Sequence, residues 1–227
     1  MRTSTRTVLC FGDSNTHGTC PIASDGIRRR HDRRTRWTGL LAERLERDWH
    51  VIEEGLPGRT TVHDDPIEGE HLNGLRVLPA ILHSHRPLDA VIVMLGTNDL
   101  KSRFAATPAD IALGVERVGQ RILATEWGVG VGPDAKAPNL LVVAPPPIVE
   151  TGNFGGQMMG GAAKSRAIGA SIVEAARRLG ATGHRVASLD LAGRIEPSPV
   201  DGVHYDEATH ATMARIIGDA FIALVGA

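Results

Sequence analysis

Five short apolar runs, separated by segments with helical periodicity, place the strongest constraint on how this 227-residue chain can fold. The runs occupy residues 7–11, 51–52, 88–95, 139–144 and 185–189. Each is a nearly continuous apolar stretch, which is typical of a strand covered on both faces, as in a parallel sheet. We therefore expect an α/β protein in which a five-stranded parallel sheet is enclosed by helices on both sides.

The segments between these runs predict the helices of such a fold. They lie at residues 37–45, 73–85, 107–124, 162–179 and 206–225. In the first, Trp37, Leu40, Leu41 and Leu45 form one apolar stripe at helical spacing. Pro79 should kink or shorten the second helix. The resulting three-layer α/β/α sandwich is flavodoxin-like, and we take its strand order, 2-1-3-4-5, from fold frequency alone.

Composition limits the classes of protein that fit. With 42% hydrophobic residues the chain can bury a substantial core, and we expect a single domain over residues 1–227. The 25 basic and 26 acidic residues nearly cancel, which argues against a nucleic-acid partner. No apolar run is long enough for a signal peptide or a membrane span, and two cysteines make no disulfide framework. We expect a cytoplasmic protein that does not contact a membrane.

One local charge cluster departs from this balance. Residues 28–36 contain six arginines. They could form a nucleic-acid patch, but no aromatic residue accompanies them. An exposed loop, with charges that are solvated or paired across a subunit interface, is the favoured interpretation.

A serine follows the first apolar run directly, in the sequence Gly12-Asp13-Ser14. Ligands of open α/β sheets bind at the carboxyl ends of the strands, where this serine is expected to lie. Asp and Ser are also the residues that turns and helix caps use. By itself the pattern therefore leaves both a cap and a nucleophile open.

Further polar turns follow the other strands. Gly55 comes after the second and Asn98 after the third, while Asp201 and His204 stand between the fifth strand and the last helix. In a parallel sheet these positions share one edge, so the side chains can converge. An aspartate three residues before a histidine can hold the imidazole Nδ1 and leave Nε2 to accept a proton from a hydroxyl.

Together these blocks resemble the SGNH, or GDSL-type, hydrolase superfamily, in order and at ordinary spacing. The resemblance implies that Ser14 is the nucleophile, His204 its base and Asp201 the carboxylate that orients the base. It also implies an oxyanion hole made by the backbone N–H groups of Ser14 and Gly55 and by the side-chain amide of Asn98. Loss of one such donor typically lowers the rate about 10²–10³-fold.

A narrower resemblance concerns the bacterial arylesterase/acyltransferase branch. It rests on Arg36-Trp37-Thr38-Gly39, Glu54-Gly55-Leu56, Arg59-Thr60-Thr61, Asp64-Asp65-Pro66, Leu72-Asn73-Gly74, Met94 to Asp99 and Ala144-Pro145-Pro146-Pro147. Members hydrolyse small acetyl or aryl esters, some transfer the acyl group to alcohols or peroxide, and some form multi-subunit rings. The resemblance thus implies a serine esterase and a homo-oligomer. A carbohydrate O-acetylesterase is the main alternative, and a catalytically silent binding protein a more distant one.

The substrate-binding residues are expected next to the nucleophile and the second strand: Asn15, His17, Leu56 and Pro57. Asn15 stands where the family name expects Leu, and His17 where this branch often has Trp. A rival role for His17 as the base is less favoured. We expect no cofactor and no metal, because His63, Asp64 and Asp65 are better explained by a turn before Pro66.

Overall fold

The computed structural model describes residues 5–226 and forms one five-stranded parallel sheet. Its strands are β1 (Arg6–Gly12), β2 (Trp49–Gly55), β3 (Ala90–Met94), β4 (Asn139–Ala144) and β5 (Val186–Asp190). They lie in the order β2-β1-β3-β4-β5, which confirms the order taken from fold frequency. The register pairs Gly12 with both Gly55 and Met94, so the first three strands end side by side.

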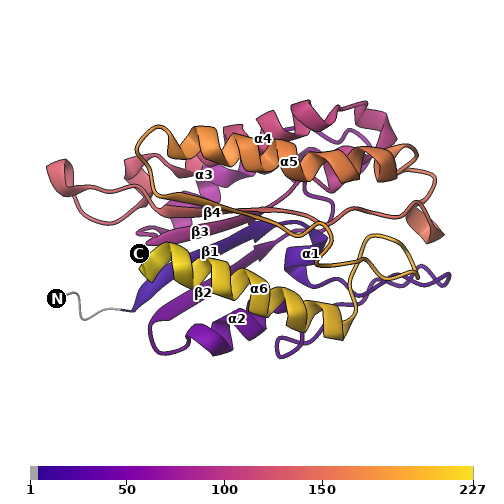
Figure 1. Cartoon of the computed structure of the whole chain (residues 1–227), viewed down its shortest axis with the longest axis horizontal. Helices are drawn as coiled ribbons and strands as arrows, with labels where there is room; N and C mark the ends of the chain where they lie inside the picture. The colour runs from indigo at the N-terminus through magenta and orange to yellow at the C-terminus, as the bar shows by residue number, and fades with distance from the viewer. Residues whose placement is uncertain (1–4, 227) are drawn as a thin grey trace.

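Helices cover both faces of the sheet, as Figure 1 shows. One face carries α3 (Gly74–His85), α4 (Pro108–Ile122) and α5 (Gly161–Gly180), and the other carries α2 (Trp37–Leu45) and α6 (Glu207–Gly226). Each face of the sheet has its own hydrophobic core, and alternate residues of β1 point into one or the other. Leu9 and Phe11 face α3 to α5, whereas Val8 and Cys10 face α2 and α6. The three-layer α/β/α sandwich is therefore confirmed.

Local sequence accounts for several helix boundaries. Thr107 and Asp110 form a capping box at the start of α4, with Pro108 in the first turn. The Asn73 side chain caps α3 by accepting the N–H of Arg76. Pro79 lies inside α3, which still runs to His85, so of the two expected effects of this proline, a kink or a shorter helix, the shortening does not occur.

Two elements differ from the sequence-based expectation. The second strand extends from Trp49 to Gly55, because the polar residues Glu53 and Glu54 continue it past the apolar pair at residues 51–52. A one-turn helix, α1 (Ser14–His17), follows β1 and is too short to show a periodic pattern. This turn of helix determines where Ser14 lies.

The last helix is the one described helix long and apolar enough to cross a membrane by length and composition. Met213, Ile217, Phe221 and Leu224 of α6 are buried against the sheet together with α2. Burial in this core accounts for the apolar character of the helix.

Candidate active site

The turn after β1 presents the hydroxyl group of Ser14. The Asp13 side chain caps α1 by accepting the N–H of Asn15 at 2.9 Å, and Gly18, with φ of 84°, ends the helix. Ser14 is the first residue of α1, where a backbone N–H has no partner inside the helix. Within residues 5–226, neither the hydroxyl nor the N–H of Ser14 forms a hydrogen bond. Both groups are therefore available to a ligand.

A buried aspartate holds the imidazole of His204. The Nδ1 atom of His204 lies 2.7 Å from Oδ2 of Asp201, and this same oxygen accepts the N–H of Ile22 at 2.7 Å. The other oxygen of Asp201 accepts the backbone N–H groups of Val203 and His204, both at 3.0 Å. Burial by itself raises the pKa of Asp201. The hydrogen bond from the His204 ring, the charge of that ring and the backbone N–H groups of His204 and Ile22 have a larger, opposite effect, so the pKa is lowered to about 2. The carboxylate thus stays charged and leaves Nε2 of His204 for the pocket.

The side-chain amide of Asn98 is held in place by the turn after β2 and by Asp13. Its side-chain nitrogen donates to the carbonyl oxygen of Arg59 at 3.1 Å and lies 3.5 Å from Oδ2 of Asp13. The neighbouring Asp99 is buried and accepts both the N–H and the hydroxyl of Thr61, the latter at 2.6 Å. One N–H of the Asn98 amide therefore donates to Arg59. The other is too far from Asp13 for a strong hydrogen bond, so it is available to donate to a ligand.

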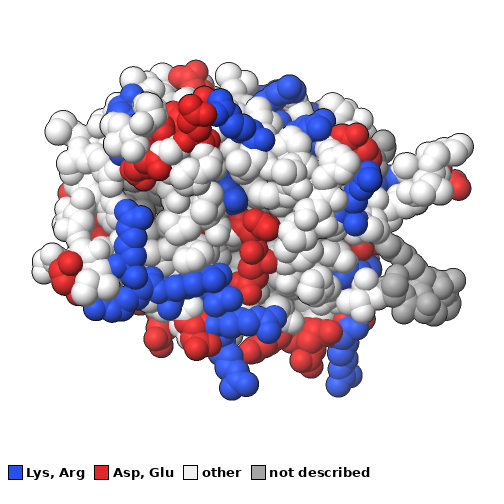
Figure 2. All heavy atoms as spheres, turned by 180° about the vertical axis from the view of Figure 1, so that it is seen from behind, with Lys and Arg blue, Asp and Glu red and all other residues white. Residues whose placement is uncertain are grey.

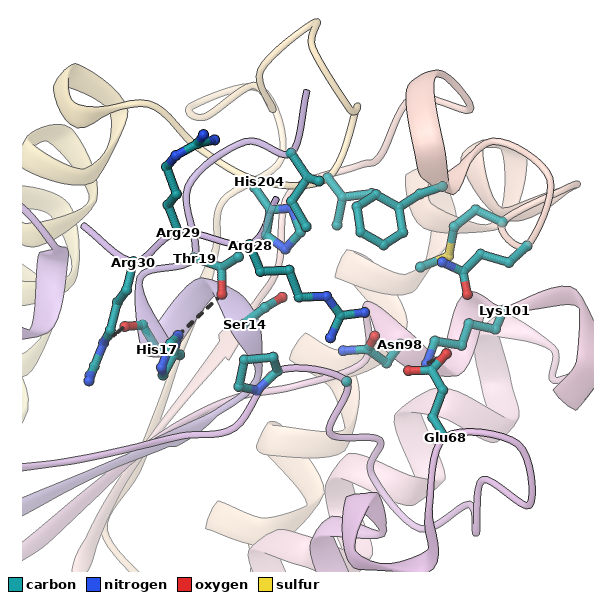
Figure 3. A pocket seen from close by; sticks show the side chains of 17 residues that line it. Ser14, His17, Thr19, Arg28, Arg29, Arg30, Glu68, Asn98, Lys101 and His204 are labelled. Atoms are coloured by element: carbon teal, nitrogen blue, oxygen red, sulfur yellow. Dashed lines mark hydrogen bonds and ion pairs between the residues drawn. The ribbon is translucent and has the colours of Figure 1, made fainter. Parts of the chain in front are cut away.

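These groups meet in one pocket. Ser14, Asn98 and His204 line a cavity of about 170 Å³ at the carboxyl edge of the sheet. In Figure 3, the Ser14 hydroxyl lies beside the His204 ring, with Asn98 further along the same pocket. Residues separated by up to 190 positions in sequence thus surround one space, as the arrangement of strand ends predicts.

Three of the expected pocket residues lie elsewhere. Asn15 is fully buried and links two loops: its carbonyl accepts the indole N–H of Trp37 at 3.0 Å, and its side chain donates to the carbonyl of Val203 at 3.3 Å. Gly55 and Leu56 do not line the pocket either. These three residues thus lie outside the pocket lining, because α1 packs between the end of β2 and the cavity, and a contact of any of them with substrate stays a prediction.

Gly55 serves this packing. A Cβ atom at this position would lie 2.1 Å from the backbone nitrogen of His17 and 2.6 Å from the carbonyl carbon of Thr16. Backbone atoms cannot move aside as a flexible side chain can. Glycine is thus required here for the close approach of α1.

Replacement of Gly55 by alanine should therefore disturb both stability and activity. We expect the free energy of unfolding to fall by about 1–3 kcal/mol, and esterase activity to fall as well because α1 carries Ser14. Urea denaturation and ester turnover measure the two effects. Gly156→Ala is the matched control, since a Cβ there meets no atom within 4 Å. Equal stability of the two variants would contradict this role of Gly55.

The turn after β2 reaches the cavity three residues later. Gly58 lines the pocket with Pro57, and its φ of 88° favours glycine. Among the described residues its N–H has no hydrogen-bond partner, whereas the N–H of Leu56 is bound to the carbonyl of Gly12 at 3.1 Å. Sequence reasoning passed over Gly58 and chose Gly55, although both glycines stand in the same turn.

His17 and Pro57 do line the pocket, as expected. The Nδ1 atom of His17 lies 3.2 Å from the Thr19 hydroxyl. Burial, together with the positive charges of Arg30 and Arg36, lowers the pKa of His17 to about 4. His17 is therefore neutral at physiological pH and is part of the pocket wall.

This lowered pKa makes a testable prediction for pH dependence. Because His17 is already deprotonated above about pH 5, replacing it by glutamine should leave the shape of the kcat/KM profile between pH 5 and pH 8 unchanged. The size of kcat/KM can change, since the pocket wall changes. A profile that loses its pH dependence in His17→Gln would instead identify His17 as the titrating base.

The segment 151–161 contributes more than a surface cover. Phe154 and Met158 line the pocket, and the Phe154 ring lies edge-on to the His204 ring, with centroids 5.4 Å apart. Asn153 donates to the carbonyl of Ala23 at 2.7 Å and so ties this segment to the loop after α1. The glycine-rich sequence around Phe154 carries no periodic signal that would have predicted this role.

The candidate metal residues are occupied by other contacts. The His63 imidazole pairs with Asp99 at 2.9 Å, and Asp65 accepts the N–H groups of Ile67 and Glu68, as expected for a turn. In the described part of the chain, no three His, Cys, Asp or Glu side chains gather in a way that could hold a metal ion.

The fold and this pocket define a class of protein. A parallel α/β/α sandwich that brings a free serine hydroxyl, an aspartate-bound histidine and an asparagine amide to one strand edge is suited to acyl chemistry on esters. The GDSL-like lipase/acylhydrolase family matches residues 10–212. The chain belongs to this family, within the SGNH superfamily, and is a carboxylic ester hydrolase.

Solved structures agree with this assignment. An aryl esterase of M. smegmatis is 38% identical, with a TM-score of 0.86, and covers 96% of this chain and 99% of its own. Est24, a carbohydrate acetylesterase from Sinorhizobium meliloti, is 40% identical with a TM-score of 0.85 and the same coverage. A putative arylesterase from Agrobacterium tumefaciens is 35% identical over 96% of this chain and 99% of its own, with a TM-score of 0.81. Among curated proteins, no significant match was found.

Proposed function

We propose that this protein is a serine esterase that hydrolyses small acetyl and aryl esters through an acyl-enzyme on Ser14. The observation that carries the proposal is the convergence of Ser14, His204 and Asn98 on one pocket, with His204 held by Asp201 at 2.7 Å. Similarity to an aryl esterase and to a carbohydrate acetylesterase supports the same chemistry.

In the first half of the reaction, the Ser14 oxygen attacks the ester carbonyl carbon while Nε2 of His204 takes the hydroxyl proton. The charged Asp201 stabilises the imidazolium that forms. When the tetrahedral intermediate collapses, the carbon–oxygen bond to the alcohol breaks and the alcohol leaves with the proton from His204. Water then repeats the sequence on the acyl-enzyme and releases the acid. The nucleophile, the base and the orienting carboxylate of both halves of the reaction are side chains of the protein: Ser14, His204 and Asp201.

The negative charge of the tetrahedral intermediate needs donors that are already in place. We assign this role to the backbone N–H groups of Ser14 and Gly58 and to the amide of Asn98. The two backbone groups have no other partner among residues 5–226, and all three residues line the pocket. Gly58 thus replaces Gly55 in the oxyanion hole that the sequence suggested.

Pocket size supports a short acyl group. A cavity of about 170 Å³ that must also contain the reacting carbonyl has room for an acetyl group and part of the alcohol. Apolar side chains of Ile22, Val203, Phe154 and Met158 contribute to its walls. A p-nitrophenyl ester series from acetate to octanoate tests this, and we expect kcat/KM to decrease beyond the shortest members. Failure of Ser14 to react with a fluorophosphonate probe would contradict the proposal as a whole and favour a silent binding protein.

A carbohydrate O-acetylesterase is the second candidate. It is supported by the 40% identity to Est24 and by the polar rim of the pocket. Acetylated sugars assayed beside aryl acetates separate the two. The same assays with added alcohol or peroxide, followed by product analysis, test acyl transfer as a further activity of the acyl-enzyme.

We also propose that the protein forms a homo-oligomer and works in the cytoplasm. The resemblance to the arylesterase/acyltransferase branch, some of whose members form multi-subunit rings, supports an interface between copies. Sedimentation at micromolar concentration tests the oligomer, and a monomer alone would contradict it.

A further inference from the structure

Basic side chains surround the mouth of the active-site pocket. Arg28, Arg29, Arg30 and Lys101 are among its lining residues, against one acidic residue, Glu68. The whole chain has a net charge of −1, so this local excess does not follow from composition. Figure 2 shows one run of lysine and arginine side chains along the lower left of the molecule, among others scattered over this face.

Two of these charges are already balanced. The Lys101 ammonium group lies 3.0 Å from Oε1 of Glu68 and 3.3 Å from Oδ2 of the buried Asp65. Arg29 pairs with Asp25 at 3.2 Å, and in Figure 3 its side chain points away from Ser14. Neither residue therefore leaves an unbalanced charge for a ligand.

Arg30 and Arg28 are different. Arg30 donates from Nε to the carbonyl oxygen of His17 at 2.8 Å and forms no ion pair with a described residue, and the acidic group that its charge senses, Glu53, is already paired with Arg36. Arg28 forms no ion pair and no hydrogen bond with any described residue. In Figure 3 its side chain extends across the pocket, with the guanidinium group between Ser14 and Asn98.

Such a group is a receptor for an anion. A guanidinium presents several N–H donors in a planar fork that matches the two oxygens of a carboxylate. In Figure 3, Arg30 lies on the other side of His17, so it adds to the positive potential of this wall without competing for the ligand. The lowered pKa of His17, caused by burial and then by Arg30 and Arg36, is a second sign of positive potential at this wall.

We propose that this esterase selects esters that carry a carboxylate, which Arg28 binds while the ester carbonyl lies at Ser14. The inference deepens the proposed function and rests on it. The carboxylate can be attached to the acyl part or to the alcohol part of the ester. The experiment below tests each of these two positions with its own pair of esters.

The test compares matched esters that differ in one charge. In the alcohol arm, 4-acetoxybenzoate is compared with methyl 4-acetoxybenzoate, and in the acyl arm, mono-p-nitrophenyl succinate with p-nitrophenyl butyrate. Each kcat/KM is divided by the second-order rate constant for cleavage of the same ester by imidazole, a neutral nucleophile that the carboxylate does not repel, which corrects for intrinsic reactivity. We expect a preference for the charged ester of about three- to tenfold in at least one arm, as for a partly exposed charged pair.

Arg28→Gln should remove this preference, and Arg28→Glu should reverse it. Arg34→Gln is the matched control, since Arg34 is exposed in the same loop, lies outside the pocket lining and changes the net charge equally. Raising NaCl from 50 to 500 mM should reduce the preference of the wild type and of Arg34→Gln, because salt screens exposed charges. The Arg28→Gln variant should show no such salt effect.

The outcomes separate the inference from the proposed function. If Ser14 reacts with the fluorophosphonate probe and neutral esters are hydrolysed, but neither arm shows a preference, the carboxylate inference is overturned and the esterase stands. An equal loss of preference in Arg28→Gln and Arg34→Gln would also overturn it, because net charge alone would then explain the effect. If Ser14 does not react, the proposed function fails first.

Discussion

Replacing Ser14 with alanine is expected to lower kcat for p-nitrophenyl acetate by about 10⁴-fold or more, since loss of a nucleophile in serine hydrolases has effects of this size. Alanine removes the oxygen that forms the acyl-enzyme and changes little else, because the Ser14 hydroxyl forms no hydrogen bond within residues 5–226. The cap of α1 comes from Asp13 and is untouched. Stability should therefore stay close to that of the wild type.

The measurement combines turnover with covalent labelling. Ser14→Ala should fail to gain the mass of a fluorophosphonate adduct, and its circular dichroism and melting temperature should match the wild type. Ser171→Ala is the control, since Ser171 is half-buried on α5 and its hydroxyl donates only to the carbonyl of Ala167, at 3.3 Å. Turnover by Ser14→Ala at a level close to that of Ser171→Ala would refute the acyl-enzyme mechanism.

Asp201→Asn should have an effect of similar size, about 10⁴-fold on kcat, as for the equivalent change in a serine protease triad. The asparagine amide can donate to Nδ1 of His204, which would place the imidazole proton on Nε2. A base with its proton on Nε2 cannot accept the Ser14 hydroxyl proton. The imidazolium would also lose the charge that now lies 2.7 Å from Nδ1.

Asp206→Asn is the matched control for this change. Asp206 accepts the N–H of Thr209 at 2.8 Å at the start of α6, and asparagine serves such a position nearly as well. We expect Asp206→Asn to retain wild-type kcat. An Asp201→Asn variant within tenfold of the wild type would show that Asp201 acts only in packing.

The same carboxylate predicts a dependence of stability on pH. Its pKa is lower in the folded chain, about 2, than its ordinary value of 3.8, so the unfolded chain binds the proton more tightly. The contribution of Asp201 to stability is therefore complete above about pH 4 and is lost as pH falls through 2. The Asp201→Asn variant should lack this part of the acid dependence.

The layer architecture could be predicted from the sequence because it follows from local patterns. A continuous apolar run such as residues 139–144 is stable as a strand only when both of its faces are buried. A helix with one apolar stripe, such as residues 37–45, buries that stripe by packing against a sheet. Both elements occur with the bounds expected for them. The second strand is longer than expected because the charged residues Glu53 and Glu54 interrupt the apolar pattern before the strand ends.

The catalytic residues could be recognised for a related reason. Ser14, Asn98 and the Asp201–His204 pair each follow a strand or precede a helix, and a parallel sheet brings such positions to one edge. Chemistry of the side chains then limits what the group can do. This part of the prediction needed topology but no atomic detail.

What the sequence by itself determined is thus the sandwich, the edge at which the site lies and the side chains that converge there. Only the tertiary structure decided that Gly58, rather than Gly55, lines the pocket, that Asn15 is a buried link, and that Arg28 enters the cavity. The physical reason is that these outcomes depend on how α1 and the loops pack against one another. Contacts of that kind, between backbone atoms and between residues far apart in sequence, leave no periodic pattern in the chain.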